Sequence, residues 1–232
     1  MQRSTHCISS AAEDVYKRTV VRYSGAGSFN SLTITGCNIH QYNRSFVAGN
    51  TTSAILNTLT VNNRVVTDVL TSGGDFIDFR NSDVLNVTVS NSTFNNCAPG
   101  RDFFRIDAAG DSNGTGQTCN ILLDSCTLYG VSNTADRILY VRFNSTDITV
   151  RKSIFAETTA YYSNQSSTDA NIDFISNNYF NAPGFYDSAQ TRYDATTTYT
   201  TLNPGFTNAA AGNFTLSNQT LIDNAIGDPR WR

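Results

Sequence analysis

The chain has 232 residues, a formal net charge of −3 and 39% hydrophobic residues. Only two of its 19 acidic residues are Glu and only two of its 16 basic residues are Lys, whereas Asn, Ser and Thr make up about a third of the sequence. Strong helix formers are therefore scarce, which argues against a helical bundle or an α/β fold, although the chain can still bury a sizeable core. Scattered arginines disfavour a nucleic-acid partner, and no apolar run is long enough for a membrane span.

The N-terminal residues predict a cap rather than part of a repeat. Ser10 and Glu13 have the spacing of a capping box, which opens a short helix, and we expect this helix to end near Arg18. Residues 1–19 are therefore expected to form an N-terminal cap. No hydrophobic segment follows the charge near Met1, so the sequence shows no signal-peptide pattern.

A short phrase repeats along the middle of the chain: an apolar residue, several small or polar residues, then a second apolar residue. Its six copies follow each other at steps of 27, 28, 34, 27 and 25 residues. Before most copies another apolar residue lies two positions upstream, which is the alternation of a strand with one buried face. Each phrase predicts a strand, a sharp bend and a second strand. The first positions are Ile34, Val61, Val89, Leu123, Val150 and Ile175.

The third and fourth positions of the phrase describe the bend. The third position favours Gly and Asn, which tolerate left-handed backbone. It reads Gly36, Asn63, Asn91, Ser125, Lys152 and Asn177. The fourth position is mostly small or polar, which predicts a stacked interior ladder of Cys37, Arg64, Ser92, Cys126, Ser153 and Asn178. The bulky Arg64 does not fit such a ladder and leaves the register of its coil open.

Further strands are expected between the phrases, at residues 74–80, 101–107 and 136–142. Three strands per coil, stacked coil upon coil, make a parallel β-helix. The predicted fold is thus all-β, a right-handed parallel β-helix of about six to seven coils over residues 20–183. An antiparallel sandwich is the structural alternative, but its hairpins would not repeat about every 27 residues.

After Pro183 the repeat ends in a tract rich in Tyr and Thr, and the chain closes on Gly227-Asp228-Pro229-Arg230-Trp231-Arg232. Both ends of a solenoid expose strand edges and apolar interior, which must be covered. We therefore expect residues 184–232 to form a C-terminal capping segment.

Metal and disulfide signals are weak. The five cysteines include no C-x-x-C pair, so we expect buried free thiols rather than a zinc site or a disulfide framework. Residues 107–115 carry spaced oxygen ligands that loosely suggest calcium, although a solvated turn at Asn113-Gly114 explains them better. His6 and His40 are interpreted as surface or cap residues. No other cofactor is expected.

The strand Asp102-Phe103-Phe104-Arg105-Ile106-Asp107, the Asn-x-x-Phe strand ends and the closing G-D-P-R-W carry a family resemblance. The chain resembles pectate-lyase-like right-handed parallel β-helices, and more closely surface proteins of unknown function from polysaccharide-degrading gut Bacteroidetes. The likeness covers roughly residues 20–232. It implies an exported protein, often anchored on the outer cell surface, that usually carries additional N-terminal domains.

The motifs of characterised β-helix enzymes are missing from this sequence. Polygalacturonase-like hydrolases share N-T-D, D-D, G-H-G and R-I-K motifs, and the nearest string here, Arg105-Ile106-Asp107, has Asp in place of Lys. The D-H pair and the R-x-P-x-x-R element of pectate lyases are also missing, and two lysines offer no clear counterpart to the Lys/Arg pair of chondroitinase-like lyases. A standard enzyme is therefore disfavoured, and catalysis stays open.

Alternation in the middle strands places two polar ladders on the solvent side of the predicted solenoid. They are Asp78 over Arg105 over Tyr140, and Arg80 over Asp107 over Arg142. Arginines pair bidentately with carboxylate or sulfate groups, and a tyrosine offers a flat face to a sugar ring, so this patch suits an acidic polysaccharide. Tyr161 and Tyr162 are additional candidates for stacking on a glycan.

For β-elimination, Arg105 and Arg142 would neutralise the substrate carboxylate. Tyr140 would be the base, since arginine stays protonated. The alternative for all six residues is purely structural, because cross-strand Asp–Arg pairs stabilise sheets by about 0.2–1 kcal/mol each. The sequence thus predicts a surface polysaccharide-binding β-helix with lyase-like cleavage as an extension. The other reading is a non-catalytic structural or adhesive β-helix.

Overall fold

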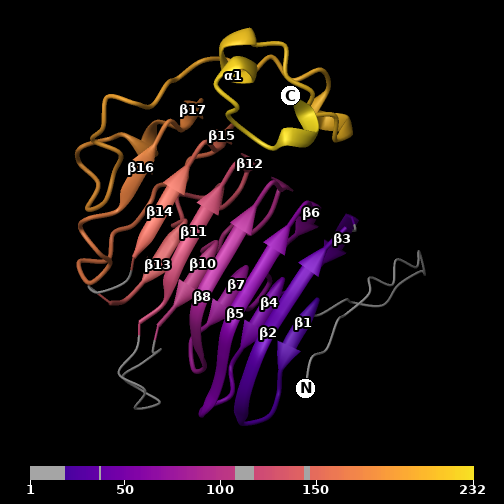
Figure 1. The fold of residues 1–232 in the computed structure, drawn as a ribbon, viewed down its shortest axis with the longest axis vertical. Coiled ribbons are helices and arrows are strands. Elements are labelled where there is room, and N and C mark those ends of the chain that lie inside the picture. Colours follow the sequence, from indigo (N-terminus) through magenta and orange to yellow (C-terminus); the bar gives the residue numbers. More distant parts are fainter. Residues whose placement is uncertain (1–18, 37, 108–117, 144–146) are drawn as a thin grey trace.

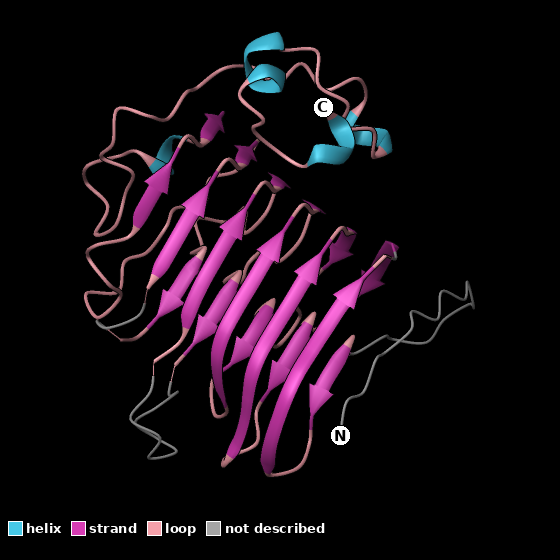
Figure 2. Ribbon diagram, viewed as in Figure 1, coloured by secondary structure: helices cyan, strands magenta, loops and turns pink. Residues whose placement is uncertain are grey.

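The computed structural model describes residues 19–36, 38–107, 118–143 and 147–232, and the regular secondary structure in these ranges is mostly β-strand (Figure 2). Their strands form three parallel sheets, which we call A, B and C. Sheet A contains β1 (Val21–Tyr23), β4 (Val47–Gly49), β7 (Ile77–Phe79), β10 (Phe104–Ile106) and β13 (Leu139–Val141). Sheet B contains β2 (Gly27–Thr35), β5 (Ala54–Asn62), β8 (Asp83–Ser90), β11 (Asn120–Asp124), β14 (Ile148–Arg151) and β16 (Asp173–Ile175). Sheet C contains β3 (Asn38–Tyr42), β6 (Val65–Val69), β9 (Thr93–Asn95), β12 (Thr127–Tyr129), β15 (Ile154–Ala156) and β17 (Asn178–Phe180).

The chain visits sheets A, B and C in turn, so each coil contributes one strand to each sheet and lies on the coil before it (Figure 1). The predicted parallel β-helix is confirmed, but its number of coils is smaller than expected. Sheet A has five strands and the other two sheets have six, so the described chain makes five complete turns and a sixth that lacks its sheet A strand. The prediction of six to seven coils was too high because residues 160–163, where that strand would fall, form only isolated bridges.

Short helices lie only toward the C-terminal end of the described chain. They are η1 (Pro183–Phe185), η2 (Ala209–Ala211), α1 (Gln219–Asp223) and η3 (Pro229–Trp231). None of these elements has the length and apolar character that crossing a membrane requires. The helix expected near residues 10–18 lies outside the described residues.

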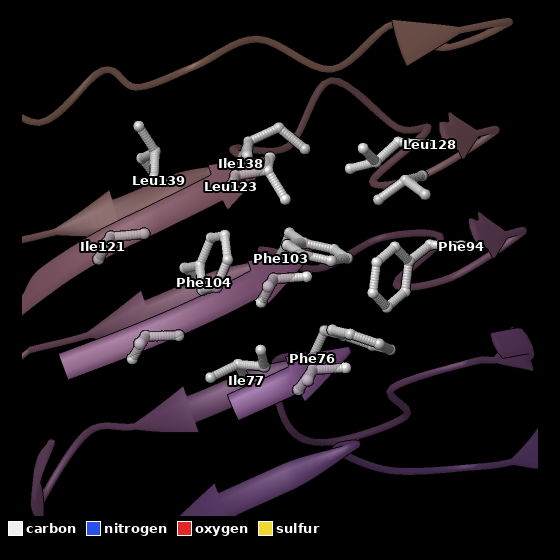
Figure 3. Close-up of a cluster of buried hydrophobic side chains, with 14 of the residues drawn as sticks. Phe76, Ile77, Phe94, Phe103, Phe104, Ile121, Leu123, Leu128, Ile138 and Leu139 are labelled. Atoms are coloured by element: carbon white, nitrogen blue, oxygen red, sulfur yellow. The ribbon is translucent and has the colours of Figure 1, made fainter. Parts of the chain in front are cut away.

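Apolar side chains from all three sheets fill the interior. Phe46, Phe76 and Phe103 follow one another up the stack with ring centres 5.0 and 4.6 Å apart. Phe94 meets Phe103 edge to face (Figure 3). Stacked and edge-to-face aromatic pairs contribute beyond the area that they bury. Identical positions on successive coils therefore form columns, which tie the register of each coil to that of its neighbours.

Five of the six phrases stack as the repeat predicts. Ile34 pairs with Val61, Val61 with Val89, and the column continues through Leu123 to Val150, all of them buried. The register is continuous at the coil of Arg64, whose side chain is buried inside the bend.

The sixth phrase is shifted by one residue. Val150 pairs with Phe174, whereas Ile175 pairs with Arg151 and is 42% exposed. The prediction for Ile175 was therefore wrong, because Phe174 and Ile175 are both apolar and the sequence pattern alone did not decide which of them is buried.

The predicted left-handed bend lies between sheets B and C in every coil. Its backbone φ is 75° at Gly36, 55° at Asn63 and 48° at Asn91, and the higher coils continue with Ser125, Lys152 and Ser176. Asn177 was wrongly placed at this position, since the one-residue shift makes Ser176 the bend residue, with φ 52°. A second left-handed column follows the sheet C strands and had no counterpart in the sequence analysis. It comprises Gln41, Asp68, Asn96, Gly130, Glu157 and Asn181.

Polar side chains inside the first bend connect one coil to the next. The Ser92 hydroxyl accepts a hydrogen bond from the Arg64 amide, and the Ser153 hydroxyl accepts one from the Cys126 amide, both at 3.1 Å. The Asn177 side-chain oxygen accepts from the Ser153 amide at 3.1 Å, so Asn177 rather than Asn178 continues the interior ladder. Each bond satisfies a buried amide that the tight bend would otherwise leave without a partner.

Three of the five cysteines lie in the described chain, and all three are buried free thiols, as expected. Burial raises the pKa of Cys97 to about 12, and it raises the pKa values of Cys119 and Cys126 as well. These thiols are protonated at neutral pH and serve as small core residues.

After the last coil the chain returns across the outer face of sheet C, where Figure 1 shows it in yellow beside β12 and β15. Leu216, Leu221 and Ile226 pack there against Ile154 and Ala156, forming a second small hydrophobic cluster outside the solenoid. This cluster explains why outward-facing residues of β15 are apolar.

The closing residues continue down the stack as a clasp, which we define as residues 227–231. The Gly227 amide donates to the Lys152 carbonyl, and the buried Asp228 carboxylate accepts from the Thr93 hydroxyl at 2.7 Å. Arg230 donates to the carbonyl of Arg64, and the Trp231 indole N–H donates to the Thr93 hydroxyl. The clasp therefore holds several successive coils with hydrogen bonds outside the sheet ladders.

Replacing Asn91 with Val tests the first bend. A β-branched residue in left-handed backbone is strained, so we expect the free energy of unfolding to fall by about 1–2 kcal/mol, measured by urea titration. The matched control is Asn91→Gly, which accepts the same φ and should stay close to the parent protein. Equal stability of the Val variant and the parent would contradict the role of the bend.

Replacing Asp228 with Ala tests the clasp. Because hydrogen bonds to a charged group are worth about 1.5–3 kcal/mol, we expect a loss of unfolding free energy of that size. Asp223→Ala is the control, since Asp223 is exposed on α1 and accepts only from Gln219. If both variants lost the same small amount, the clasp would not stabilise the solenoid.

Candidate functional site

The candidate site is the outward surface of sheet A. The structure places Arg105 directly between Asp78 and Tyr140 on the parallel strands β7, β10 and β13, as the sequence alignment of the coils predicts. Arg80, Asp107 and Arg142 lie two residues further along, just beyond the strand ends. Three more outward residues precede the strands, and the whole set is called the sheet A face. It comprises Asp75, Asp78, Arg80, Asp102, Arg105, Asp107, Arg137, Tyr140 and Arg142.

Asp75 connects two neighbouring coils of the face. Its Oδ2 accepts hydrogen bonds from Arg80 at 3.0 Å and from Arg105 at 3.3 Å, and its Oδ1 accepts from the Asp102 amide at 3.1 Å. Arg80 also donates its Nε to Asp78 at 2.8 Å, and Arg105 donates its Nε to Asp107 at 2.9 Å. The ion pairs thus run both along each strand and across the stack.

Arg137 and Asp102 form the third pair. The Arg137 Nε donates to Asp102 Oδ1 at 2.6 Å, and a second nitrogen donates to Oδ2 at 3.0 Å, which is the bidentate geometry of a strong charge-assisted pair. Burial raises the pKa of the Asp102 carboxyl, and the hydrogen bonds and charge of Arg137 offset only part of this rise. Burial therefore disfavours the ionised form of Asp102, and the pairing with Arg137 compensates for part of that cost.

The arginines cover the carboxylates. Asp75, Asp78 and Asp102 have side chains at most 3% exposed, whereas the side chains of Arg80, Arg105 and Arg137 are 22–29% exposed. Burial lowers the pKa of Arg105, but the hydrogen bonds and charges of Asp107 and Asp75 outweigh it, and the net change is upward. The pKa of Arg80 is raised by its hydrogen bond to Asp78. None of these guanidinium groups can act as a base.

Tyr140 lies among three arginines. The Cζ atoms of Arg137, Arg105 and Arg142 are 4.5, 5.0 and 5.9 Å from the centre of its ring. Such contacts are cation–π interactions, which fix the ring and the guanidinium groups relative to one another. The ring is half-buried, so part of it stays accessible at the surface.

Arg142 differs from the other arginines of the face. It is exposed, and within the described part of the chain its guanidinium forms neither an ion pair nor a hydrogen bond, only the contact with Tyr140. The three other arginines are each neutralised by at least one carboxylate. The face therefore presents one cation that is free to meet an anion from solution.

The two tyrosines predicted to stack on a glycan have different environments. Tyr161 is half-buried and bridges to Arg137 at the upper edge of the sheet A face. Tyr162 is fully buried, and its hydroxyl lies 2.9 Å from that of Tyr179, which donates to Asp194. The prediction for Tyr162 was therefore wrong, because the alternation of side chains sends it into the core. Asp78 is also buried beneath Arg80 and offers little surface to a ligand.

The sequence analysis missed Asp75, Asp102 and Arg137 as members of the site. Each lies two residues before the first residue of β7, β10 or β13, on the same outward side as the predicted ladders. Alternation did not mark them, because two consecutive residues in each coil are buried before the outward residue of the ladder, as Phe76 and Ile77 are before Asp78.

The metal and histidine expectations fall largely outside the described chain. Of the calcium-like stretch 107–115 only Asp107 is described, and His6 lies in the undescribed N-terminal part. His40 is exposed on β3. Among the described residues, no cluster of three or more His, Cys, Asp or Glu side chains is arranged to hold a metal ion.

Comparison with known proteins finds two family models on consecutive stretches of the chain. Residues 121–231 match a domain of unknown function (DUF5123), and residues 9–97 match another domain of unknown function (DUF4957). No curated protein and no solved structure matches the chain. The two matched stretches meet inside one continuous solenoid, because β8 pairs with β11 and β9 with β12 across the junction.

Replacing Asp102 with Asn tests the electrostatics of the face. A pKa raised by folding means that the carboxyl contributes stability below its unfolded pKa of about 3.8 and loses that contribution as pH rises through the folded value. Asn cannot ionise. The stability of the variant relative to the parent should therefore increase between about pH 3 and about pH 7 in urea titrations.

The control for this measurement is Asp223→Asn at an exposed position on α1, which removes a carboxylate outside the sheet A face. A change in the opposite direction for Asp102→Asn would show that the pairing with Arg137 outweighs the burial of the carboxyl.

Proposed function

We propose that this protein is a polysaccharide-binding β-helix that binds an acidic glycan on the sheet A face. The observation that carries the proposal is the exposed Arg142, which lacks a carboxylate partner in the described chain and lies beside Tyr140. A guanidinium pairs bidentately with a carboxylate or sulfate, and the neighbouring tyrosine offers a flat surface to the sugar that carries it. Uronic acids and sulfated sugars have this combination of groups.

The remainder of the face supports this role by holding Tyr140 and Arg142 in place. Asp75, Asp102 and Asp107 fix Arg105 and Arg137, and these two arginines hold the Tyr140 ring. A binding group that is already ordered loses less conformational entropy when a ligand arrives. The ion pairs are therefore a supporting layer, and the contacts to the glycan come from the residues above them.

Cleavage by β-elimination would extend the same site. Arg142 would neutralise the uronate carboxylate, and Tyr140, acting as the phenolate, would accept the proton from the adjacent carbon. The bond to the glycosidic oxygen would break as a carbon–carbon double bond forms, and Tyr140 would pass the proton to that leaving oxygen. Tyr140 is the candidate base because the surrounding arginines remain protonated. The reaction would be seen as ultraviolet absorbance of an unsaturated uronate product.

One observation favours a second candidate function, a non-catalytic structural or adhesive β-helix. Four carboxylates and three of the four arginines of the sheet A face are paired with one another, so most of its charge is neutralised internally. Cross-strand ion pairs of this kind stabilise sheets without any ligand. Arg142 is the group whose behaviour separates the two functions.

The proposed location is the extracellular space or the outer cell surface, in a protein with further N-terminal domains. This part of the proposal rests on the resemblance of the repeat and of the closing G-D-P-R-W to bacterial surface β-helices, and on the partner being a polysaccharide.

Replacing Arg142 with Ala tests the binding function. With polygalacturonate as the probe, we expect calorimetry to show binding about tenfold weaker than in the parent, since one charge-assisted contact is worth roughly 1.4 kcal/mol or more. Binding by the parent should also weaken as salt rises, because exposed charges are screened within about 8–10 Å.

The control is Arg151→Ala on sheet B, an exposed arginine paired with Asp124. This variant should bind like the parent. Equal binding by both variants, or binding that salt does not affect, would remove the sheet A face as the site. Absence of binding to any acidic polymer would favour the structural function.

A further inference from the structure

Above the sheet A face the surface contains a hollow of about 560 Å³, which is within the range of about 300–1,000 Å³ typical of small-ligand pockets. It is lined by Thr159, Pro183, Gly184, Tyr186, Asp187 and Ser188. These residues come from the sixth coil, from η1 and from the three residues that follow η1, so the hollow is formed where the solenoid ends and the C-terminal segment begins.

The aromatic wall of the hollow is held rigidly. The ring of Tyr186 stacks on that of Tyr199, with centres 5.3 Å apart and planes 17° apart, and it also contacts Tyr179 at 6.0 Å. Tyr186 is half-buried and lines the hollow, while its ring is fixed by these two neighbours. A flat apolar surface of this kind matches the C–H face of a sugar ring.

The floor of the hollow needs a glycine. A Cβ atom on Gly184 would lie 2.5 Å from the Ala160 carbonyl oxygen and 3.2 Å from the Cβ of Tyr161. Any side chain would push η1 away from the last coil and change the shape of the hollow. The same close approach places Gly184 beside Tyr161, which bridges to Arg137 on the sheet A face.

The polar groups of the hollow select its ligand. Asp187 is exposed, and its Oδ1 accepts from the Ala189 amide at 2.9 Å, whereas no described residue donates to its Oδ2. The lining contains no cation, so an acidic group would meet an unfavourable charge there. A free carboxylate oxygen and a nearby hydroxyl from Ser188 accept hydrogen bonds well from sugar hydroxyls.

We infer that this hollow binds a neutral sugar ring of the same polysaccharide whose acidic residue is bound at Arg142. The inference rests on the proposed function and makes it more specific: the ligand is a glycan that carries neutral and acidic sugars close together. Tyr186 supplies the stacking surface, Asp187 accepts from the hydroxyl groups, and Tyr161 lies between the two sites.

The experiment compares three probes in calorimetry: polygalacturonate, which is only acidic, a galactan, which is only neutral, and a rhamnogalacturonan, in which acidic and neutral residues alternate. The parent protein should bind the alternating polymer most tightly. Tyr186→Ala should weaken that binding about tenfold and leave polygalacturonate binding unchanged, whereas Tyr186→Phe, which keeps the ring, should stay within about twofold of the parent.

Asp187→Asn keeps the measurement decisive if Tyr186→Ala does not fold, because Asn retains the bond to the Ala189 amide. It should weaken binding of the alternating polymer and of the galactan, and Asp223→Asn on α1 should not. If these variants bind all probes like the parent while Arg142→Ala does not, the hollow is no sugar site and the proposed function stands. If galactan binding depends on Tyr186 but polygalacturonate does not bind, the proposed acidic site at Arg142 is wrong and the hollow stands as a sugar site. If none of the three probes binds, both proposed sites are wrong.

Discussion

The left-handed bend between sheets B and C is the constraint on which the rest of the structure depends. A parallel strand can follow its neighbour in register only if each coil turns at the same place, and here one residue per coil does this, from Gly36 to Ser176. A residue other than Gly in this conformation costs about 1–2 kcal/mol, less for Asn, so each turn stores some strain. Side chains inside the bend, such as Ser92, Ser153 and Asn177, offset that cost by satisfying buried amides.

Regular stacking also creates the sheet A face. Because residues at one position of successive strands lie directly above one another, a single column can carry Asp75, Asp102 and Arg137, and the next can carry Asp78, Arg105 and Tyr140. Columns of this kind concentrate charge in a way that isolated strands could not. The carboxylates that are paired with arginines lie below the surface of the face. Arg142, which has no carboxylate partner in the described chain, and part of the Tyr140 ring lie at that surface. In this repeating fold the paired carboxylates therefore lie deeper than the exposed Arg142.

Much of this arrangement could be predicted from the sequence, and the failures have physical reasons. Periodicity predicts the repeat step, the left-handed bends at Asn63 and Asn91, and the alignment of Arg105 with Asp78 and Tyr140. It can be recognised in the sequence without knowledge of the contacts in the fold. The shift at Ile175 could not be predicted, because two adjacent apolar residues satisfy the pattern equally well. The burial of Tyr162 depends on its partner Tyr179, in the sheet C strand of the same coil, and on Asp194 in the C-terminal segment. The hollow at Tyr186 is formed by segments without any repeat, so no pattern in the sequence marks it.

The clasp also has a kinetic consequence. Arg230 reaches the carbonyl of Arg64 across 166 residues of sequence, whereas successive coils meet across about 27. Loop-closure entropy favours the nearer contacts, so the coils can assemble first and the clasp closes over them last. Contacts that form after the folding transition state mainly slow unfolding. The closing residues therefore act chiefly on the lifetime of the folded solenoid. The hydrogen bond between Arg230 and Arg64 joins the two matched domains of unknown function, so we expect the two domains to fold as one unit.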